Sequence, residues 1–390
     1  MRIIHTSDWH AGKRLNRESR LPDLNYALEQ MADFAKSEKV EFIILAGDVF
    51  DSVNPSFEAQ EIVFEFFRKM HREGRKSIIV GGNHDSIGLF KSLKGLMSLA
   101  SCYIFEKPQL IEPLKLQSND NQILVVYPLP YPHQSFMFRL ERDTDEREQI
   151  KTYREKLKNM LVSISEKISS EKSGFKVLLS HLMVDNAKIS GSERPVSVLN
   201  TYSISQDILS PYFDYIALGH IHRPQKINNS KEIDIRYSGS PYQLNFGEEE
   251  DKSFVFIDIE NSGKARIENI QLTLKRPLKV FQMNEKNIEE VMNSAKRFQG
   301  LIKFEIFLNN PVAGLYERIR REVSNTVFIN THFSNDESKK NWERTEFDPR
   351  DVSSVYREYY QSVNKRLPPP KNEEMIKRFL KEIEMNESLL

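Results

Sequence analysis

The chain has 390 residues, of which 39% are hydrophobic, 29% charged and 10% aromatic. This composition excludes a largely disordered chain and predicts two or three globular domains, since one domain usually has ~150 residues. Lys+Arg and Asp+Glu both number 56, so no net charge draws the whole protein to nucleic acid or to an acidic membrane.

The cysteine count and the apolar runs indicate the compartment. Cys102 is the only cysteine, which excludes an internal disulfide and a cysteine-based zinc site; we expect it to be a small buried residue. The apolar run at the N-terminus is too short for a signal peptide, and no stretch has the roughly 18 apolar residues of a membrane span. We therefore expect a cytoplasmic protein without a membrane partner.

The first half of the chain alternates short apolar runs with amphipathic stretches, which predicts an α/β domain of strands and covering helices. Strands are expected at 2–6, 41–46, 77–81, 123–127, 176–180 and 212–218. Helices are expected at 23–37, 57–73, 89–99 and 146–170. After residue 219, strand-like segments at 233–238, 253–259 and 265–274 predict a second sheet that closes the same domain.

A smaller β-α-β-α-β unit begins near Pro277. Its strands are expected at 278–282, 301–308 and 326–331, and its helices at 287–298 and 312–323. Two amphipathic helices follow, around 352–363 and 375–383, with the stiff Pro368-Pro369-Pro370 between them. We thus expect a division into 1–275, 276–345 and 346–390.

Five short polar motifs follow predicted strands. They are Asp8-Trp9-His10, Gly47-Asp48-Val49-Phe50-Asp51, Gly81-Gly82-Asn83-His84-Asp85, Ser180-His181 and Gly219-His220-Ile221-His222. Because ligands of α/β sheets collect at the carboxyl ends of the strands, we expect these motifs to meet at one edge. Each motif alone is weak evidence for a functional site, since a histidine at a strand end is more often structural. Five such motifs in order are much stronger evidence.

The residue types of these motifs predict a metal site. Imidazole, carboxylate and amide donors without a thiolate suit Mn²⁺, Fe²⁺ or Zn²⁺. In Asp8-x-His10 and His220-x-His222, alternate residues of an extended chain would point the same way and share an ion. The candidate ligands are Asp8, His10, Asp48, Asn83, His181, His220 and His222.

Seven ligands exceed the need of one ion. If Asp48 bridges, they divide into two sets of four, and two ions ~3.5–4 Å apart favour in-line displacement at phosphorus by an activated water. His84 follows a ligand and is expected to face the phosphate as a stabiliser or acid, with Asp51 holding its ring. The predicted reaction is phosphoester hydrolysis.

On these residues the sequence resembles the calcineurin-like metallophosphoesterases, whose motifs are D-x-H, G-D-x-x-D, G-N-H-[DE], a lone His and G-H-x-H. The opening His5 to Gly12, with Tyr237 to Pro241 and Leu244 to Glu248, resembles more closely the nuclease subunits that bacteria assemble with a coiled-coil ATPase. The resemblance covers the whole length. It implies a β-sandwich flanked by helices (1–275), a small α/β capping domain (276–345) and C-terminal helices (346–390) that dock on the ATPase.

The resemblance also implies roles for individual residues. Asp8, His10, Asp48 and His222 would hold one metal, and Asp48, Asn83, His181 and His220 the other. His84 would act on the phosphate, and the family's preferred ion is manganese, with Mg²⁺, Fe²⁺ and Zn²⁺ as alternatives. Asp51 agrees with the bacterial branch, whereas the archaeal and eukaryotic branch tends to place a His there.

The implied substrates are DNA ends and hairpins, cut by exonuclease and endonuclease action together with the ATPase, by a homodimer within a heterotetramer. Lys13, Arg14, Arg17 and Arg20 follow His10 and are candidates for gripping the DNA backbone. A merely solvated loop is the alternative for these cations, and packing on their own domain is the alternative for the tail helices.

Two other functions fit the same residues. One is a small-molecule or nucleotide phosphodiesterase, or a phosphoprotein phosphatase, on the same dimetal site. The other is a metal-binding scaffold that organises an ATPase without catalysis. Retention of His84 beside seven candidate ligands favours an enzyme over the scaffold.

Overall fold

The computed structural model describes residues 1–108, 112–133, 146–185, 187–190, 203–209 and 211–333, with residue 369. Both predicted tail helices, around 352–363 and 375–383, lie outside the described residues. Within the described residues no helix is long and apolar enough to cross a bilayer.

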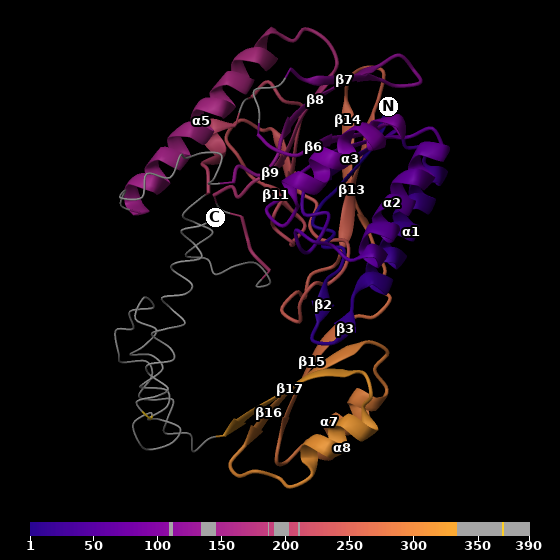
Figure 1. Ribbon diagram of the computed structural model, residues 1–390, viewed down its shortest axis with the longest axis vertical. Coiled ribbons are helices and arrows are strands. Elements are labelled where there is room, and N and C mark those ends of the chain that lie inside the picture. Colours follow the sequence, from indigo (N-terminus) through magenta and orange to yellow (C-terminus); the bar gives the residue numbers. More distant parts are fainter. Residues whose placement is uncertain are drawn as a thin grey trace.

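Two six-stranded sheets form the larger part of the fold (Figure 1). The first has the order β14-β13-β1-β4-β5-β6 and the second the order β11-β12-β10-β9-β8-β7. The first consists of β1 (Arg2–Thr6), β4 (Phe42–Ala46), β5 (Lys76–Val80), β6 (Cys102–Phe105), β13 (Ser253–Ile259) and β14 (Ala265–Gln271). The second consists of β7 (Leu114–Gln117), β8 (Ile123–Leu129), β9 (Phe175–His181), β10 (Tyr215–Gly219), β11 (Gln225–Ile227) and β12 (Asp234–Tyr237).

The sheets pack face to face with helices outside both. α1 (Leu21–Ser37), α2 (Phe57–Arg72) and α3 (Ile87–Leu99) cover the first sheet, and α5 (Glu146–Ser170) covers the second. Figure 1 shows α5 on one side of the strands and α1 and α2 on the other. The apolar layer between the sheets includes Ile44, Val177 and Ala217, all fully buried. A strand covered on both faces has no polar side, which explains the unbroken run Phe42–Ala46. The predicted fold class is confirmed, and Cys102 is buried as expected.

The strands after residue 219 differ from the prediction of a sheet of their own. β13 pairs antiparallel with β1 in the first sheet, whereas β12 pairs parallel with β10 in the second. The late part of the chain therefore completes one edge of each sheet.

A three-stranded parallel sheet, β15-β16-β17, lies beyond the sandwich. Its strands are β15 (Leu278–Asn284), β16 (Leu301–Leu308) and β17 (Thr326–Phe333). The helices α7 (Ile288–Lys296) and α8 (Leu315–Glu322) connect these strands. The hairpin of β2 (Arg14–Leu15) and β3 (Glu18–Ser19) lies between this unit and the sandwich (Figure 1). Leu15 packs there with Phe246 and Leu278, so the small sheet rests on an apolar contact.

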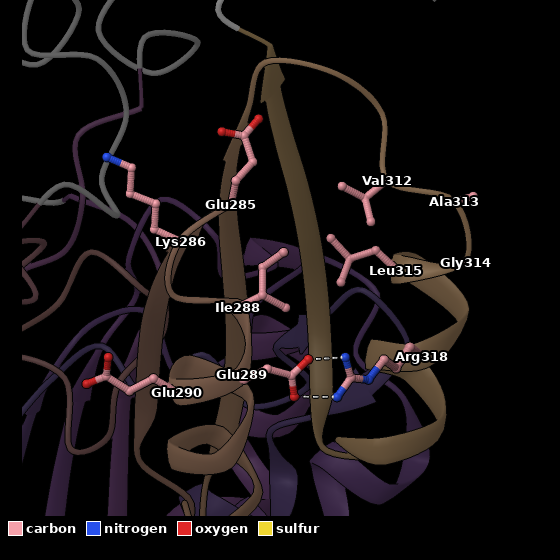
Figure 2. Close-up of a pocket in the computed structure, with 10 residues that line it drawn as sticks. All are labelled: Glu285, Lys286, Ile288, Glu289, Glu290, Val312, Ala313, Gly314, Leu315 and Arg318. Carbon is pink, nitrogen blue, oxygen red and sulfur yellow. Dashed lines mark hydrogen bonds and ion pairs between the residues drawn. The ribbon is translucent and has the colours of Figure 1, made fainter.

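This small unit also has an open pocket of about 520 Å³ between its two helices (Figure 2). Glu289 and Arg318 form a two-pronged ion pair beside apolar Ile288, Val312 and Leu315. The five polar motifs are all elsewhere, at the strand ends of the sandwich.

Candidate metal centre

The predicted motifs meet where the carboxyl ends of the strands of both sheets come together. Hydrogen bonds join the sheets at this edge: His181 Nδ1 donates to the Ala46 carbonyl (2.8 Å), and the His220 N–H to Asp8 Oδ1 (3.0 Å). Six of the seven candidate ligands follow β1 (Asp8, His10), β4 (Asp48), β5 (Asn83) and β10 (His220, His222), and His181 is the last residue of β9.

Side chains from both sheets form the first donor group. Asp8, His10 and His222 offer atoms that all lie within 4.8 Å of one another, and all three residues are buried. The Nε2 atoms of His10 and His222 are 3.2 Å apart.

The second donor group consists of Asp48, His181 and His220, with the Asn83 amide beside them. Asn83 Oδ1 lies 3.0 Å from both His181 Nε2 and His220 Nδ1, and these two nitrogens are 3.2 Å apart.

Asp48 connects the two groups. Its Oδ2 lies 3.5 Å from His10 Nε2 and 3.4 Å from His181 Nε2. Donors bound at ~2.1 Å to a common ion are separated by ~3 Å or slightly more. His10 and His222 in the first group have this spacing, as do Asn83, His181 and His220 in the second. Two imidazole nitrogens facing each other at 3.2 Å also suit a shared cation, because a hydrogen can lie between them from only one ring. The donor set therefore fits two divalent metals with Asp48 between them.

Three of the four candidate histidine ligands have a polar partner at Nδ1, the ring nitrogen that faces away from the donor group. The Ala46 carbonyl contacts His181 Nδ1, Asp51 Oδ1 lies 3.1 Å from His10 Nδ1, and Glu248 Oε1 lies 3.3 Å from His222 Nδ1. Such contacts fix the tautomer and aim the other ring nitrogen at a metal.

The backbone at these residues is not extended, contrary to the argument from alternation. Asp8, His10, Asp48 and His220 have φ of 52°, 42°, 50° and 96°. Left-handed conformations are costly for such residues and cluster at functional sites. Asp8 and His10 nevertheless share the first donor group, whereas His220 and His222 fall into different groups rather than sharing one.

His84 lies beside the first donor group, with its ring 4.8 Å from that of His10. Its Nδ1 contacts the backbone carbonyl of Asp51 at 3.0 Å. The expectation that the Asp51 carboxylate holds His84 is therefore corrected: the carboxylate contacts His10 and Lys13 instead. Asp51 orients both histidines, through different atoms.

Burial and charge set the protonation of the donors. Burial opposes ionisation of Asp48, yet His181 and His10 hold its pKa well below the usual range. Burial and His181 lower the pKa of His220 to about 3, which leaves a neutral imidazole. Asp48 and His220 are thus in the forms that bind metals, an ionised carboxylate and a neutral imidazole. Burial opposes a charge on His181, but Asp48 raises its pKa to about 9, so metal binding there must displace a proton.

The four cations after His10 do not behave alike. Lys13 Nζ lies 3.3 Å from Asp51 Oδ1, and Arg14 and Arg17 are exposed on the β2–β3 hairpin. Arg20 is fully buried, and its guanidinium donates to the carbonyl oxygens of Gln243 and Arg276. The expectation that Arg20 grips DNA is corrected, because this side chain is buried against Gln243 and the segment that leads into β15.

Three residues near the centre were not predicted from sequence. The Tyr131 ring stacks 6.0 Å from that of His220, and His133 packs 4.9 Å from Tyr131. They follow β8, which pairs parallel with β9, so the end of another strand at this edge was the available signal. Glu248 had only its place in a motif of the resemblance, with no indication of its contact to His222.

The comparisons with known proteins give two relatives that match nearly the whole chain. The SbcD component of the SbcCD nuclease of Bacillus subtilis (strain 168) is 28% identical over 387 residues, covering 97% of each chain. The SbcD component from Staphylococcus epidermidis is 28% identical over 370 residues, covering 93% of each. A dimetal phosphatase structure from Danio rerio has a TM-score of 0.41 at 13% identity, covering 70% of this chain and 99% of that one, too low a score to support an argument.

The family "Calcineurin-like phosphoesterase" matches residues 1–224, a range that contains all seven donors and His84. This match takes in more than half of the chain, and the strand-end motifs inside it are those that the structure brings to one edge. The chain therefore belongs to the calcineurin-like phosphoesterases.

Proposed function

We propose that this chain is the metal-dependent DNA nuclease subunit of an SbcCD-type complex, with exonuclease activity and endonuclease activity on hairpins. The observation that carries the proposal is the position of Asp48 Oδ2 between His10 Nε2 and His181 Nε2, at 3.5 and 3.4 Å. This arrangement suits two ions that share one carboxylate, and the full-length similarity to SbcD proteins supports DNA as the substrate.

In this proposal Asp8, His10, Asp48 and His222 hold one ion, and Asp48, Asn83, His181 and His220 hold the other. Two bound divalent cations, Mn²⁺ by preference, would supply Lewis acidity to the phosphodiester and lower the pKa of a water.

His84 is proposed as the acid or electrostatic stabiliser at the phosphate. A carbonyl only accepts hydrogen bonds, so the contact with Asp51 places the hydrogen of His84 on Nδ1. Nε2 is then the nitrogen that, once protonated, donates to a phosphate or leaving-group oxygen. His84 offers a nitrogen within 4.8 Å of ligand atoms of His10 and Asp48, and in this proposal it faces the phosphate instead of binding an ion.

The remaining parts are proposed to serve the same reaction. Residues 1–275 form the nuclease domain, 276–345 a capping domain beside the DNA path, and 346–390 a segment that docks on the coiled coil of SbcC. Lys13, Arg14 and Arg17 are candidates for backbone phosphate contacts. A homodimer within a heterotetramer is proposed from the resemblance, and exposed apolar side chains such as Leu96 and Leu99 on α3 suit such a contact.

An end-labelled hairpin duplex tests the proposal. The purified chain is assayed with Mn²⁺, Mg²⁺ or EDTA, alone and with SbcC plus ATP, beside His84→Ala and the control His71→Ala, which alters an exposed histidine of α2. We expect Mn²⁺-dependent cutting that falls ~10²–10⁴-fold in His84→Ala and is unchanged in the control.

Each contrary result identifies a different failure. Rapid hydrolysis of a small phosphodiester without any DNA cutting would favour the phosphodiesterase alternative. Cutting that survives His84→Ala would remove this histidine from the mechanism. Absence of both activities in every metal would favour a scaffold.

A further inference from the structure

A buried ion pair lies directly behind His222. Glu248 Oε1 is 3.3 Å from His222 Nδ1, while Glu248 Oε2 is 2.5 Å from Lys252 Nζ. Glu248 and Lys252 are each only 1% exposed. Two opposite charges so deeply buried are costly to place unless further polar contacts satisfy them.

Further polar contacts satisfy the pair, and one of them also involves His222. Lys252 Nζ donates to the His222 carbonyl (3.3 Å) and to Ser240 Oγ (3.0 Å), and also pairs with Glu250 Oε1 (3.1 Å). Glu248 Oε2 accepts the N–H of Leu244 at 3.0 Å. The pair is thus tied to both the ring and the main chain of one candidate ligand.

The histidines of the two donor groups have different partners at Nδ1. In the first, carboxylates stand behind the imidazoles: Asp51 behind His10 and Glu248 behind His222. In the second, His181 has the neutral Ala46 carbonyl. A carboxylate makes the imidazole in front of it a stronger donor than a carbonyl does.

We infer that Glu248 is a positioning residue for the first donor group: it holds His222 in the tautomer whose Nε2 faces His10, and Lys252 holds that carboxylate in place. The inference rests on the proposed function, in which the first group binds a divalent cation. Glu248 itself does not contact the substrate.

The test is Mn²⁺ binding to the full-length chain without DNA, by isothermal titration calorimetry with electron paramagnetic resonance to count bound ions. We expect Glu248→Gln to weaken one of two sites ~10–100-fold and to leave the other unchanged, the usual cost of removing an outer partner of a ligand. Glu250→Gln is the matched control, because it removes a carboxylate from the same lysine but leaves the contact of Glu248 with His222 in place.

Glu248→Gln leaves the ammonium of Lys252 buried beside a neutral amide, so folding is followed by circular dichroism. The double variant Glu248→Gln/Lys252→Met removes both charges and is expected to fold with the same weakened site. Two unchanged sites in a folded variant, or equal weakening by Glu250→Gln, would overturn the inference alone. A wild-type chain that binds no Mn²⁺ would instead overturn the proposed dimetal function as well.

Discussion

Asp51 shows how one residue serves two histidines through separate atoms. Its carboxylate lies 3.1 Å from His10 Nδ1 and its main-chain carbonyl 3.0 Å from His84 Nδ1. Burial opposes the charge of Asp51, but His10 and Lys13 lower its pKa, so the carboxylate is ionised at neutral pH. Only the carboxylate can be removed by substitution, which separates the two roles.

We therefore expect Asp51→Asn to act on metal affinity and His84→Ala on turnover. Without the Asp51 charge, His10 is a weaker and less firmly oriented donor, so the Mn²⁺ concentration for half-maximal activity should rise ~10–100-fold. Because the carbonyl still holds His84, the rate at saturating Mn²⁺ should return to within a few-fold of wild type. Activity titrated against Mn²⁺ checks this; a rate that no Mn²⁺ concentration restores would place Asp51 in catalysis itself.

The sequence identified the candidate ligands that the structure brings together, but not the residues that contact them. The seven candidate ligands and His84 can be identified because metal-binding residue types recur directly after apolar strands, a local pattern. The contact of Glu248 with His222 joins residues 26 positions apart, and the contact of the Asp51 carboxylate with His10 joins residues 41 positions apart. Neither leaves a local signal.

At the scale of elements, the β5–α3 loop is fitted closely around Asp48. The His84 N–H donates to Asp48 Oδ1 (2.9 Å), and Asp85 accepts the N–H groups of Gly82, Val49 and Phe50. These bonds join the loops after β4 and β5, which carry the shared donor and the amide donor. A Cβ on Gly82 would lie 2.1 Å from Asp48 Oδ1 and 2.3 Å from its main-chain nitrogen.

We expect Gly82→Ala to disable the centre while Gly88→Ala does not. The added methyl group must displace Asp48 or the loop, which costs ~1–3 kcal/mol in stability. It also moves Asp48 away from its position between the two donor groups. At Gly88, in the first turn of α3, the nearest atom to the new Cβ is 3.9 Å away, so stability should be unchanged or rise by ~0.5–1 kcal/mol. Calorimetric melting without metal and Mn²⁺ titration measure both effects. Full Mn²⁺ binding by Gly82→Ala would show that the loop adapts.

At the scale of the whole molecule, periodicity located the elements but not their partners. The predicted strands 2–6, 253–259 and 301–308 agree with β1, β13 and β16 to the residue, and the helix at 146–170 with α5. The short strands β6, β7 and β11, at or near sheet edges, were missed, since three or four residues show little alternation. The pairing of β13 with β1 spans some 250 residues, and nothing in either strand specifies its neighbour.

His5 lies in β1 opposite Val255 of β13 and belongs to neither donor group. His5 is fully buried, with Nδ1 2.8 Å from the Tyr215 hydroxyl of the opposite sheet, and burial lowers its pKa from 6.5 to about 3. Between pH 6.5 and 3 the unfolded chain therefore binds a proton here that the folded chain does not. By linkage, this residue makes folding less favourable as the pH falls below 6.5, by about 2 kcal/mol at pH 5.

Replacing His5 should remove this acid sensitivity. His5→Gln keeps a polar partner for Tyr215 and is expected to be less stable than wild type at pH 8, because the cavity is shaped for a ring. That deficit should shrink by about 2 kcal/mol when both proteins are unfolded in urea at pH 5, since only wild type loses the contribution of the buried ring. His71→Gln, at an exposed position, controls for unfolded-state effects and should show no such change. A deficit that stays constant from pH 8 to 5 would mean that His5 is protonated in the folded sandwich, with the two sheets accommodating its charge.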